Sequence, residues 1–341
     1  MPDLVAPMLA KAVDAVPEGN LLYEPKWDGF RCIVSFGPDG VELGSRGAKP
    51  LTRYFPELVD AFTRLLPEPC VLDGEIVVRT DRTGHDRLDW ESLTQRIHPA
   101  ASRVERLAAE TPASFIAFDL IARGDRDLTG EPFEIRRAEL ENLLGDLPAP
   151  IHLTRTTRDV ALARRWLDEF EGAGLDGVVA KPLDAVYQPG KRTMFKIKHH
   201  RTADVVAVGY RIHKSGQGVG SLLVGLYGPQ GQLGPIGGVS AFSDARRLEL
   251  IGELAPLVER TDEGAAATAE TARSRFSSSK DVSFVRLRPE RVLEVRYDQM
   301  EGQRFRHTVQ FERWRPDRDP TSCTYDQLEV PVTYDLADVL Q

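Results

Sequence analysis

The segment EPKWDGFR at residues 24–31 is the stretch from which the fold and chemistry of this chain can be worked out. Lys26 is the second-last residue of the run LLYEPKW (21–27), which has the composition of a strand, and Asp28-Gly29 then predicts a turn. The lysine is therefore expected at a strand end beside a turn. A lone lysine in such a place is most often a solvated surface residue, so a chemical role for Lys26 depends on the residues that accompany it.

Five further short segments follow in order along the chain. They are SRG (45–47), LDGEIV (72–77), FIAFDL (115–120), DGVVAK (176–181) and FKIK (195–198). Side chains alternate across a strand, so Asp73 shares a face with Glu75, and Lys196 shares one with Lys198. Each segment is weak evidence alone, but six segments in this order are very improbable by chance.

In this order the segments resemble the motifs of the covalent nucleotidyltransferases, the superfamily of ATP-dependent DNA ligases, RNA ligases and mRNA capping enzymes. The resemblance implies that Lys26 attacks the α-phosphorus of ATP, expels pyrophosphate and becomes a lysyl-AMP. AMP then passes to a 5′-phosphate on DNA, and a 3′-hydroxyl displaces it to seal the nick. The attacking amine must be neutral, a form that neighbouring cations favour.

The resemblance also implies which residues hold the nucleotide and a Mg²⁺ or Mn²⁺ ion. Glu75 is expected at the ribose or the metal ion, and Asp176 at the ion. The family has Glu where this chain has Asp176, and Mg²⁺ accepts either carboxylate. The residues expected to bind ATP or AMP are Glu24 and Phe118 at the adenine, Arg31 and Arg46 at the ribose and phosphates, Glu75, and the phosphate cations Arg192, Lys196 and Lys198.

Apolar patterns predict a mixed α/β unit from about residue 20 to 200, and the resemblance implies an α+β fold for residues 1–200, with antiparallel sheets and flanking helices. The resemblance identifies this domain as the adenylation (nucleotidyltransferase) domain. Strands are expected at 21–27, 30–36, 70–78, 114–122, 176–182 and 193–199, and helices at 55–66, 134–145 and 159–172.

After residue 201 the pattern changes to strands separated by glycine-rich turns. Five strands with one helix between the third and fourth predict an OB-fold β-barrel over 201–320, followed by a C-terminal tail, 321–341. Residues 263–280, rich in Ala, Ser and Thr, are predicted as a connection outside the core. The expected strands are 203–212, 220–228, 233–242, 291–300 and 305–314, and the helix is 243–254, capped by Ser243.

The second domain extends the resemblance to the ligases. HTVQFERWRPDRD (307–319) is similar to the family's last motif at Arg313, Arg315 and Asp317, although Arg318 replaces a usual Lys. GYRIHKSGQGVGSLLVGLYG (209–228) resembles the start of the OB-fold in bacterial ligases of types C and D. Type C matches better because no polymerase or nuclease module accompanies these segments. A hinge near 199–204 would bring the last motif to ATP.

Net charge taken alone argues against a nucleic-acid partner, because the chain carries 52 Asp+Glu and 44 Lys+Arg, or −8. However, residues 181–214 contain eight Lys+Arg and two Asp, and residues 286–318 contain nine Arg and six acidic residues. Both basic stretches coincide with the phosphate and DNA motifs. We therefore expect nicked or gapped double-stranded DNA as a partner, bound with salt-sensitive affinity.

Cysteine spacing and hydropathy limit the setting in which the chain works. Cys32, Cys70 and Cys323 form no CxxC pair, so neither a zinc site nor a disulfide framework is supported. No signal-peptide pattern and no run of about 18 apolar residues occurs. We expect a monomer in the bacterial cytosol or nucleoid, with no membrane association and with DNA repair proteins as further partners.

Three alternatives stay open at this point. An RNA ligase or a GTP-using capping enzyme would share the lysine chemistry. A non-catalytic OB-fold DNA-binding protein with a degenerate nucleotide domain would not need every chemical position filled. A Schiff-base enzyme built on Lys26 would need neither the KxK segment nor the Arg-rich motif.

Overall fold

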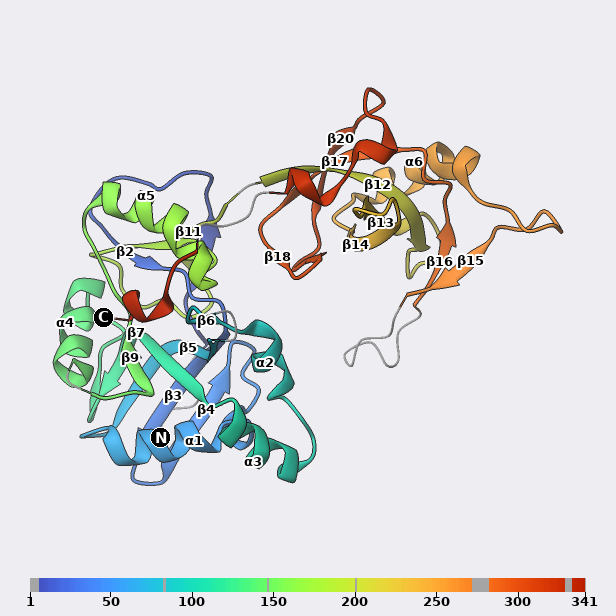
Figure 1. Ribbon diagram of the computed structural model, residues 1–341. Coiled ribbons are helices and arrows are strands. Elements are labelled where there is room, and N and C mark those ends of the chain that lie inside the picture. The colour runs from blue at the N-terminus through green and yellow to red at the C-terminus, as the bar shows by residue number, and fades with distance from the viewer. Residues whose placement is uncertain are drawn as a thin grey trace. The chain divides into compact units, whose positions relative to one another are not determined.

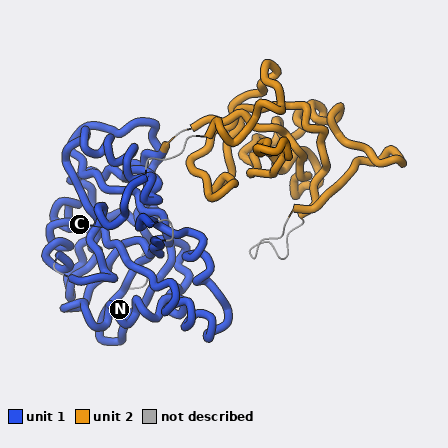
Figure 2. The backbone as a smooth tube through the Cα atoms, viewed as in Figure 1, with its two compact units in different colours: residues 1–198, 331–341 blue, residues 199–330 orange. Residues whose placement is uncertain are grey.

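The computed structural model describes residues 6–81, 84–145, 147–199, 201–271, 282–328 and 333–340. The chain forms two compact units (Figure 2). Unit 1 comprises Met1–Lys198 together with Pro331–Gln341, and unit 2 comprises His199–Val330. Each unit has its own cluster of buried apolar side chains, so each has a separate core.

Two sheets form the centre of unit 1 (Figure 1). Neighbouring strands are antiparallel except for the pairs β1/β11 and β7/β9, which are parallel. One sheet has the order β4 (Gly40–Ser45), β3 (Phe30–Gly37), β5 (Cys70–Thr80), β7 (Ala113–Arg123), β8 (Arg126–Asp127), with β6 (Arg87–Leu88) on β5 and β9 (Ile151–Leu153) on β7. The other has the order β1 (Leu9–Ala12), β11 (Arg192–Ile197), β10 (Val178–Pro182), β2 (Leu21–Pro25).

Amphipathic helices flank these sheets. The helix α1 begins with Pro56, which suits the first turn, and it buries Leu58, Ala61 and Phe62 at helical spacing. Phe62 packs edge-on against Phe115 of β7, with ring centroids 5.2 Å apart. The helices of unit 1 are α1 (Pro56–Leu65), α2 (Trp90–Gln95), α3 (Ala101–Glu110), α4 (Phe133–Leu144) and α5 (Val160–Glu169), with 3₁₀ turns at Thr52–Tyr54, Phe170–Ala173 and Leu336–Asp338.

A buried ion pair fixes α4 on the first sheet. Both side chains are almost fully buried, and Arg136 donates two hydrogen bonds to the Asp119 carboxylate of β7, at 2.8 and 2.9 Å. The Arg136 guanidinium also donates to the carbonyl oxygens of Glu131 and Ala185. The satisfied guanidinium offsets the cost of burying its charge.

Unit 2 is a small barrel. β12 (Arg201–Ile212) pairs with β13 (Val219–Tyr227), β13 with β14 (Leu233–Val239), β17 (Val292–Tyr297) with β12, and β20 (Gln310–Trp314) with β17. A parallel bridge between Val239 and Val309 joins the end of β14 to the segment that leads into β20. This pairing, with α6 (Asp244–Leu254) between the third and fourth barrel strands, is the OB-fold arrangement.

Shorter elements complete unit 2. A hairpin of β15 (Thr268–Glu270) and β16 (Ser283–Arg286) adds to β12. β18 (Met300–Glu301) pairs with β19 (Arg304–Phe305). The remaining 3₁₀ turns lie at Ala255–Leu257, Pro320–Ser322 and Tyr325–Gln327.

Most of the predicted elements are present, and three predictions were wrong in detail. The strand expected at 305–314 is interrupted, because β19 forms a separate hairpin and only Gln310–Trp314 continues the barrel. The strand expected at 291–300 ends at Tyr297 for the same reason. The connection expected at 263–280 contains β15, and its residues 272–280 lie outside the described ranges. Ser243 does cap α6, its side chain accepting from the Arg246 amide.

The residues expected as a C-terminal tail contribute to both cores. In unit 2, Cys323 is fully buried and the Gln327 side chain bonds the backbone of Asp204. In unit 1, Leu336 and Val339 are buried in the same cluster as Phe170. No helix in the described ranges has the length and apolar character that crossing a bilayer requires.

Candidate active site

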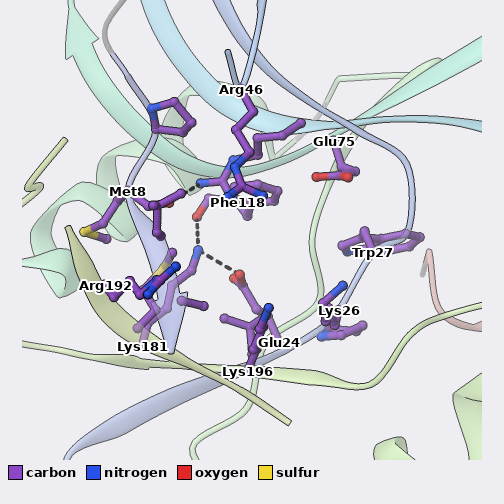
Figure 3. A pocket seen from close by; sticks show the side chains of 17 residues that line it. Met8, Glu24, Lys26, Trp27, Arg46, Glu75, Phe118, Lys181, Arg192 and Lys196 are labelled. Carbon is purple, nitrogen blue, oxygen red and sulfur yellow. Dashed lines mark hydrogen bonds and ion pairs between the residues drawn. The ribbon is translucent and has the colours of Figure 1, made fainter. Parts of the chain in front are cut away.

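A cavity of about 240 Å³ in unit 1 is lined by residues from both sheets (Figure 3). Seven of the eight residues expected to bind nucleotide line it together with the catalytic Lys26, although these residues come from seven separate strands or loops. They are Glu24, Lys26, Arg31, Arg46, Glu75, Phe118, Arg192 and Lys196. The fold thus brings together residues that are far apart in the sequence, such as Glu24 and Lys196, which are separated by 172 positions.

Lys26 and Lys198 share one carboxylate. The Lys26 ammonium lies 2.6 Å from Oδ2 of Asp176, and the Lys198 ammonium lies 2.7 Å from the same oxygen. The Asp176 side chain is 5% exposed, so the shared carboxylate is shielded from bulk water, while both lysine side chains are partly exposed. Asp176 and Lys198 are not among the residues that line the cavity; Asp176 contacts the lining residue Lys26, and Lys198 contacts Asp176.

Two turns, each containing an Asp-Gly pair, position Lys26 and Asp176. The Lys26 amide donates to the Gly177 carbonyl at 2.8 Å, and the Asp176 amide donates to the Lys26 carbonyl at 2.9 Å. Gly177 has φ of +128°, and a Cβ there would collide with the carbonyl oxygen of Ile197. Only glycine fits this position. Gly177 is therefore required for the turn that holds the backbones of Asp176 and Lys26 together.

Arg31 is fixed by Asp73, the first acidic residue of the LDGEIV segment. The guanidinium makes two hydrogen bonds to the fully buried Asp73 carboxylate, at 2.5 and 2.6 Å, and Tyr187 donates a third to that carboxylate at 2.7 Å. The guanidinium carbon lies 4.4 Å from the centre of the Phe118 ring. Arg31 therefore occupies one approach to the ring that was expected to stack on adenine.

Burial shifts two ionisable groups of the cavity toward neutrality. Burial raises the pKa of Glu75 to about 7, although Arg31 and Lys26 oppose the rise and the Gly29 amide donates to its Oε1 at 3.1 Å. Burial also lowers the pKa of Lys196, and the positive charges of Lys26 and Lys198 add to that effect. Such shifted groups in one cavity are typical of an active site.

The acidic side chains present fit a divalent cation that is bound together with phosphate. The described residues contain no group of three or more His, Cys, Asp or Glu side chains able to hold a metal ion by themselves. Mg²⁺ commonly binds one or two carboxylates plus substrate phosphates and waters. Glu75, which lines the cavity, and Asp176, beside Lys26, supply two carboxylates of that kind.

Nine further lining residues had no role predicted from the sequence, and Trp27 and Lys181 are two of them. Trp27, next to the lysine, is anchored by a hydrogen bond from its indole to the Thr154 hydroxyl at 2.8 Å. Lys181, the last residue of DGVVAK, is 2% exposed. Its position at the end of a predicted strand segment was visible in the sequence, but its burial was not. The other seven are apolar and include Met8 and Met194.

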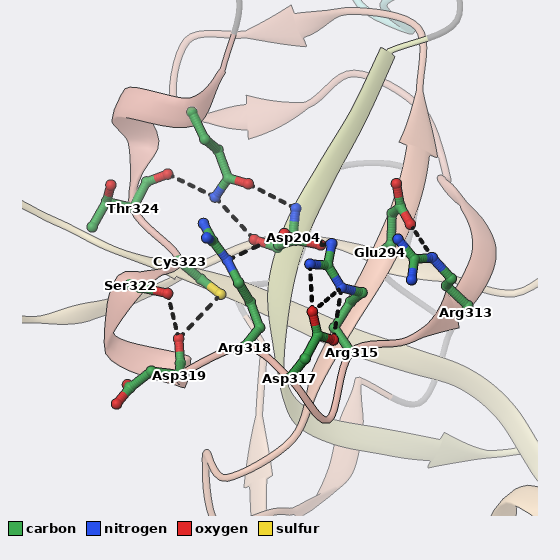
Figure 4. A network of polar contacts seen from close by, with 11 residues as sticks. Asp204, Glu294, Arg313, Arg315, Asp317, Arg318, Asp319, Ser322, Cys323 and Thr324 are labelled. Atoms are coloured by element: carbon green, nitrogen blue, oxygen red, sulfur yellow. Dashed lines mark hydrogen bonds and ion pairs between the residues drawn. The ribbon is translucent and has the colours of Figure 1, made fainter.

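The three residues of the last motif interact within unit 2 (Figure 4). Arg315 contacts the Asp204 carboxylate at 3.0 Å and the Asp317 carboxylate at 2.8 Å. Arg313 contacts Glu294 at 2.6 Å. Asp204 lies in β12 at the end of the predicted hinge. The ion pair between Arg315 and Asp204 therefore joins the last motif to the first strand of unit 2.

Comparison with known proteins identifies the class. The model of the ATP dependent DNA ligase domain matches residues 6–198, and the model of the ATP dependent DNA ligase C terminal region matches residues 215–318. The chain therefore belongs to the ATP-dependent DNA ligase family. This membership confirms the family, the fold class and the enzyme class predicted from the sequence.

Individual relatives narrow the assignment to the type C group. The chain is 56% identical to DNA ligase C of Mycobacterium tuberculosis, over 98% of this chain and 97% of that protein. It is 57% identical to DNA ligase C2 of Mycolicibacterium smegmatis, over 96% of this chain and 95% of that protein. The solved structure of a Lig E DNA ligase shares the fold, with 18% identity, a TM-score of 0.56 and coverage of 91% and 99%.

A larger relative agrees with the predicted likeness to type D. The chain is 33% identical to the multifunctional non-homologous end joining DNA repair protein LigD of Mycobacterium tuberculosis. The match covers 94% of this chain but 39% of LigD.

Proposed function

We propose that this chain seals nicks in double-stranded DNA with ATP, through a covalent AMP on Lys26. The observation that carries the proposal is the charge cluster at the cavity wall, where Lys26 shares the Asp176 carboxylate with Lys198. A lysine amine that reaches a nucleotide-sized cavity lined by other cations suits attack on a phosphate. The protein relatives that match over almost the whole chain are DNA ligases, which favours DNA over RNA ends.

The Lys26 amine would attack the α-phosphorus, form a nitrogen–phosphorus bond and release pyrophosphate. Asp176 lies 2.6 Å from the ammonium and is placed to accept its proton or to hold it until the amine is free. Arg192, Lys196 and Lys198 would offset the charge that develops on the phosphoryl oxygens. Arg31 and Arg46 would contact the ribose or phosphates, and Phe118 and Glu24 the adenine.

A Mg²⁺ or Mn²⁺ ion would be held by Glu75 and Asp176 together with the ATP phosphates. When bound, it would neutralise phosphate charge and orient the leaving group. Glu75 must be ionised to bind it, and the raised pKa of Glu75 would return toward its ordinary range beside the cation.

Residues 1–200 would form the adenylation domain, and the OB-fold of residues 201–320 would supply DNA contacts and the last motif. Arg313, Arg315 and Asp317 are the residues expected to approach the ATP phosphates in the first step and to withdraw for sealing. A hinge near 199–204 would allow this motion. We expect a cytosolic monomer that acts in DNA repair, on nicked or gapped duplexes.

The covalent step is tested by intact mass after incubation with ATP and Mg²⁺. Wild-type protein should gain the mass of one AMP, and Lys26→Ala should gain none because it lacks the amine. Lys49→Met, at an exposed lysine that does not line the cavity, is the matched control and should gain AMP normally.

Failure of the wild type to gain mass with ATP under any divalent metal would overturn the proposal. Labelling by GTP in place of ATP would favour the capping-type alternative. Sealing of a nicked RNA duplex in preference to nicked DNA would favour the RNA ligase alternative.

A further inference from the structure

Trp314 lies between the two arginines of the last motif, and the proposed reaction gives it no task. Its indole Nε1 donates to Oε2 of Glu253 in α6, at 2.8 Å. The guanidinium carbon of Arg291 lies 4.2 Å from the centre of the indole ring. Arg291 also donates to the backbone carbonyl of Glu253, at 2.9 Å. The last turn of α6 is thus joined to Trp314 both directly and through Arg291.

The Glu253 carboxylate is held by a second residue of α6. Arg246, seven residues earlier, donates to Oε1 at 2.5 Å and to Oε2 at 3.1 Å. These hydrogen bonds lower the pKa of Glu253, and the indole of Trp314 adds to the effect although burial opposes it. The helix dipole disfavours a glutamate in the last turn, so Glu253 gains its stabilisation from these contacts rather than from its place in α6.

A β-bulge in β20 decides which way the side chains of the last motif face. The register between β17 and β20 skips Glu312, which is the extra residue of the bulge. Phe311 and Trp314 are three residues apart, a spacing that puts side chains of a regular strand on opposite faces. With the bulge between them, their rings meet edge-on on the face that contacts α6, with centroids 5.1 Å apart. Arg313 and Arg315 alternate with Trp314 and so lie on the other face, where they contact acidic side chains of β17 and β12 (Figure 4).

We propose that Glu253 is a positioning residue for the first step, which holds Trp314 against α6 and so fixes the face on which Arg313 and Arg315 are presented. The proposal rests on the proposed function, because it concerns the arginines expected to serve the ATP phosphates. A displacement of about 1 Å far from the reacting atoms can slow a reaction by about 100-fold. Loss of the hydrogen bond from Trp314 would leave the bulged strand free to shift, and both arginines would move with it.

The test compares two steps of ligation in wild type, Glu253→Leu and Glu253→Gln. Leucine cannot accept a hydrogen bond, whereas glutamine keeps an oxygen that can accept from the indole. Single-turnover self-adenylation should slow by about 10- to 100-fold in Glu253→Leu and by less than about 3-fold in Glu253→Gln. Sealing of a nick that already carries AMP should stay within about 2-fold of wild type in both, because that step does not use the triphosphate.

Glu249→Leu is the matched control. Glu249 also accepts from Arg246, at 3.1 Å, and its side chain is 60% exposed, but the indole donates to Glu253. Glu249→Leu should therefore keep both rates. Glu253→Leu added to Trp314→Phe, which lacks the indole N–H, should slow self-adenylation by less than about 2-fold further, since the two residues act as one unit.

Wild-type self-adenylation in Glu253→Leu would overturn the proposal. An equal loss in both steps would also overturn it, because that result indicates a general defect of unit 2. If Glu253→Leu does not fold, Trp314→Phe decides in its place, since it should slow self-adenylation by about 10-fold and spare sealing. A wild type that gains no AMP would refute the proposed function itself, whereas a wild type that gains AMP beside an equally fast Glu253→Leu would overturn this inference alone.

Discussion

At the scale of the residue, burial rather than residue type decides which groups titrate in the working range. Glu75 and Glu42 are both glutamates, one in the cavity wall and one exposed on β4. Burial raises the pKa of Glu75 to about 7 from a usual 4.5. A carboxyl that changes charge near neutral pH makes both metal binding and stability depend on pH.

Glu75→Gln is expected to change how stability varies with pH in nucleotide-free, metal-free protein. Between about 4.5 and 7 the folded carboxyl holds a proton that the unfolded one has lost, so this group makes wild type less stable as pH rises. The neutral amide lacks that dependence. Relative to wild type, Glu75→Gln should therefore be more stable at pH 8 than at pH 4.5, by about 1–3 kcal/mol.

Thermal unfolding in EDTA from pH 4 to 8 measures this difference, with Glu42→Gln as the matched control. Parallel pH curves for wild type and Glu75→Gln would contradict the expectation.

At the scale of the element, the site depends on turns that bring backbones together. The strands β2, β10 and β11 supply Glu24, Lys181 and Lys196, but the turn at Asp176-Gly177 sets where Asp176 meets Lys26. The close approach of that turn to Ile197 leaves no room for a side chain. Even a small substitution in this turn should therefore slow self-adenylation at Lys26.

Gly177→Ala is expected to lower stability by about 1–3 kcal/mol, through overpacking and a positive φ that alanine disfavours. It should also slow self-adenylation by about 10-fold or more, since Asp176 would shift relative to Lys26. Gly130→Ala is the control, because a Cβ there meets nothing within 4 Å. Rapid-quench rates and unfolding midpoints measure both effects, and equal behaviour of the two variants would show that the turn is not constrained.

At the scale of the whole molecule, charge links the last motif to the first strand of the OB-fold. Arg315 holds Asp204 and Asp317, and Arg318 lies 3.3 Å from Asp204. If Arg315 serves the ATP phosphates in the first step, it must exchange the Asp204 carboxylate for phosphate oxygens. That exchange would couple nucleotide binding to the hinge.

Arg315→Ala is expected to slow self-adenylation by about 100-fold, because one cation that stabilises the transition state is lost. Sealing of a nick that already carries AMP should be nearly unchanged, since that step does not use the triphosphate. Arg288→Ala, at an exposed arginine paired with Glu290, is the control for lost surface charge. Single-turnover assays of both steps measure the split, and wild-type self-adenylation in Arg315→Ala would refute the role.

The order of the motifs and the α+β and OB-fold classes could be predicted from the sequence, and seven of the eight predicted nucleotide-binding residues line one cavity with Lys26. These features are local, because strand patterns, Asp-Gly turns and motif spacing are written in neighbouring residues. The C-terminal residues could not be placed in this way. Leu336 and Val339 are buried in unit 1, although the chain passes through unit 2 before it reaches them.

The pairing of charges depends on the fold and could not be predicted from the sequence. Lys26 and Asp176 are 150 residues apart, and Lys181 meets Glu24 and Phe118 only because β10 lies beside β2 and its lysine enters the core. The sequence assigned Asp176 to a metal ion and left Lys181 without a role. Burial explains the difference, since a charge removed from water must find a partner wherever the fold brings one within reach.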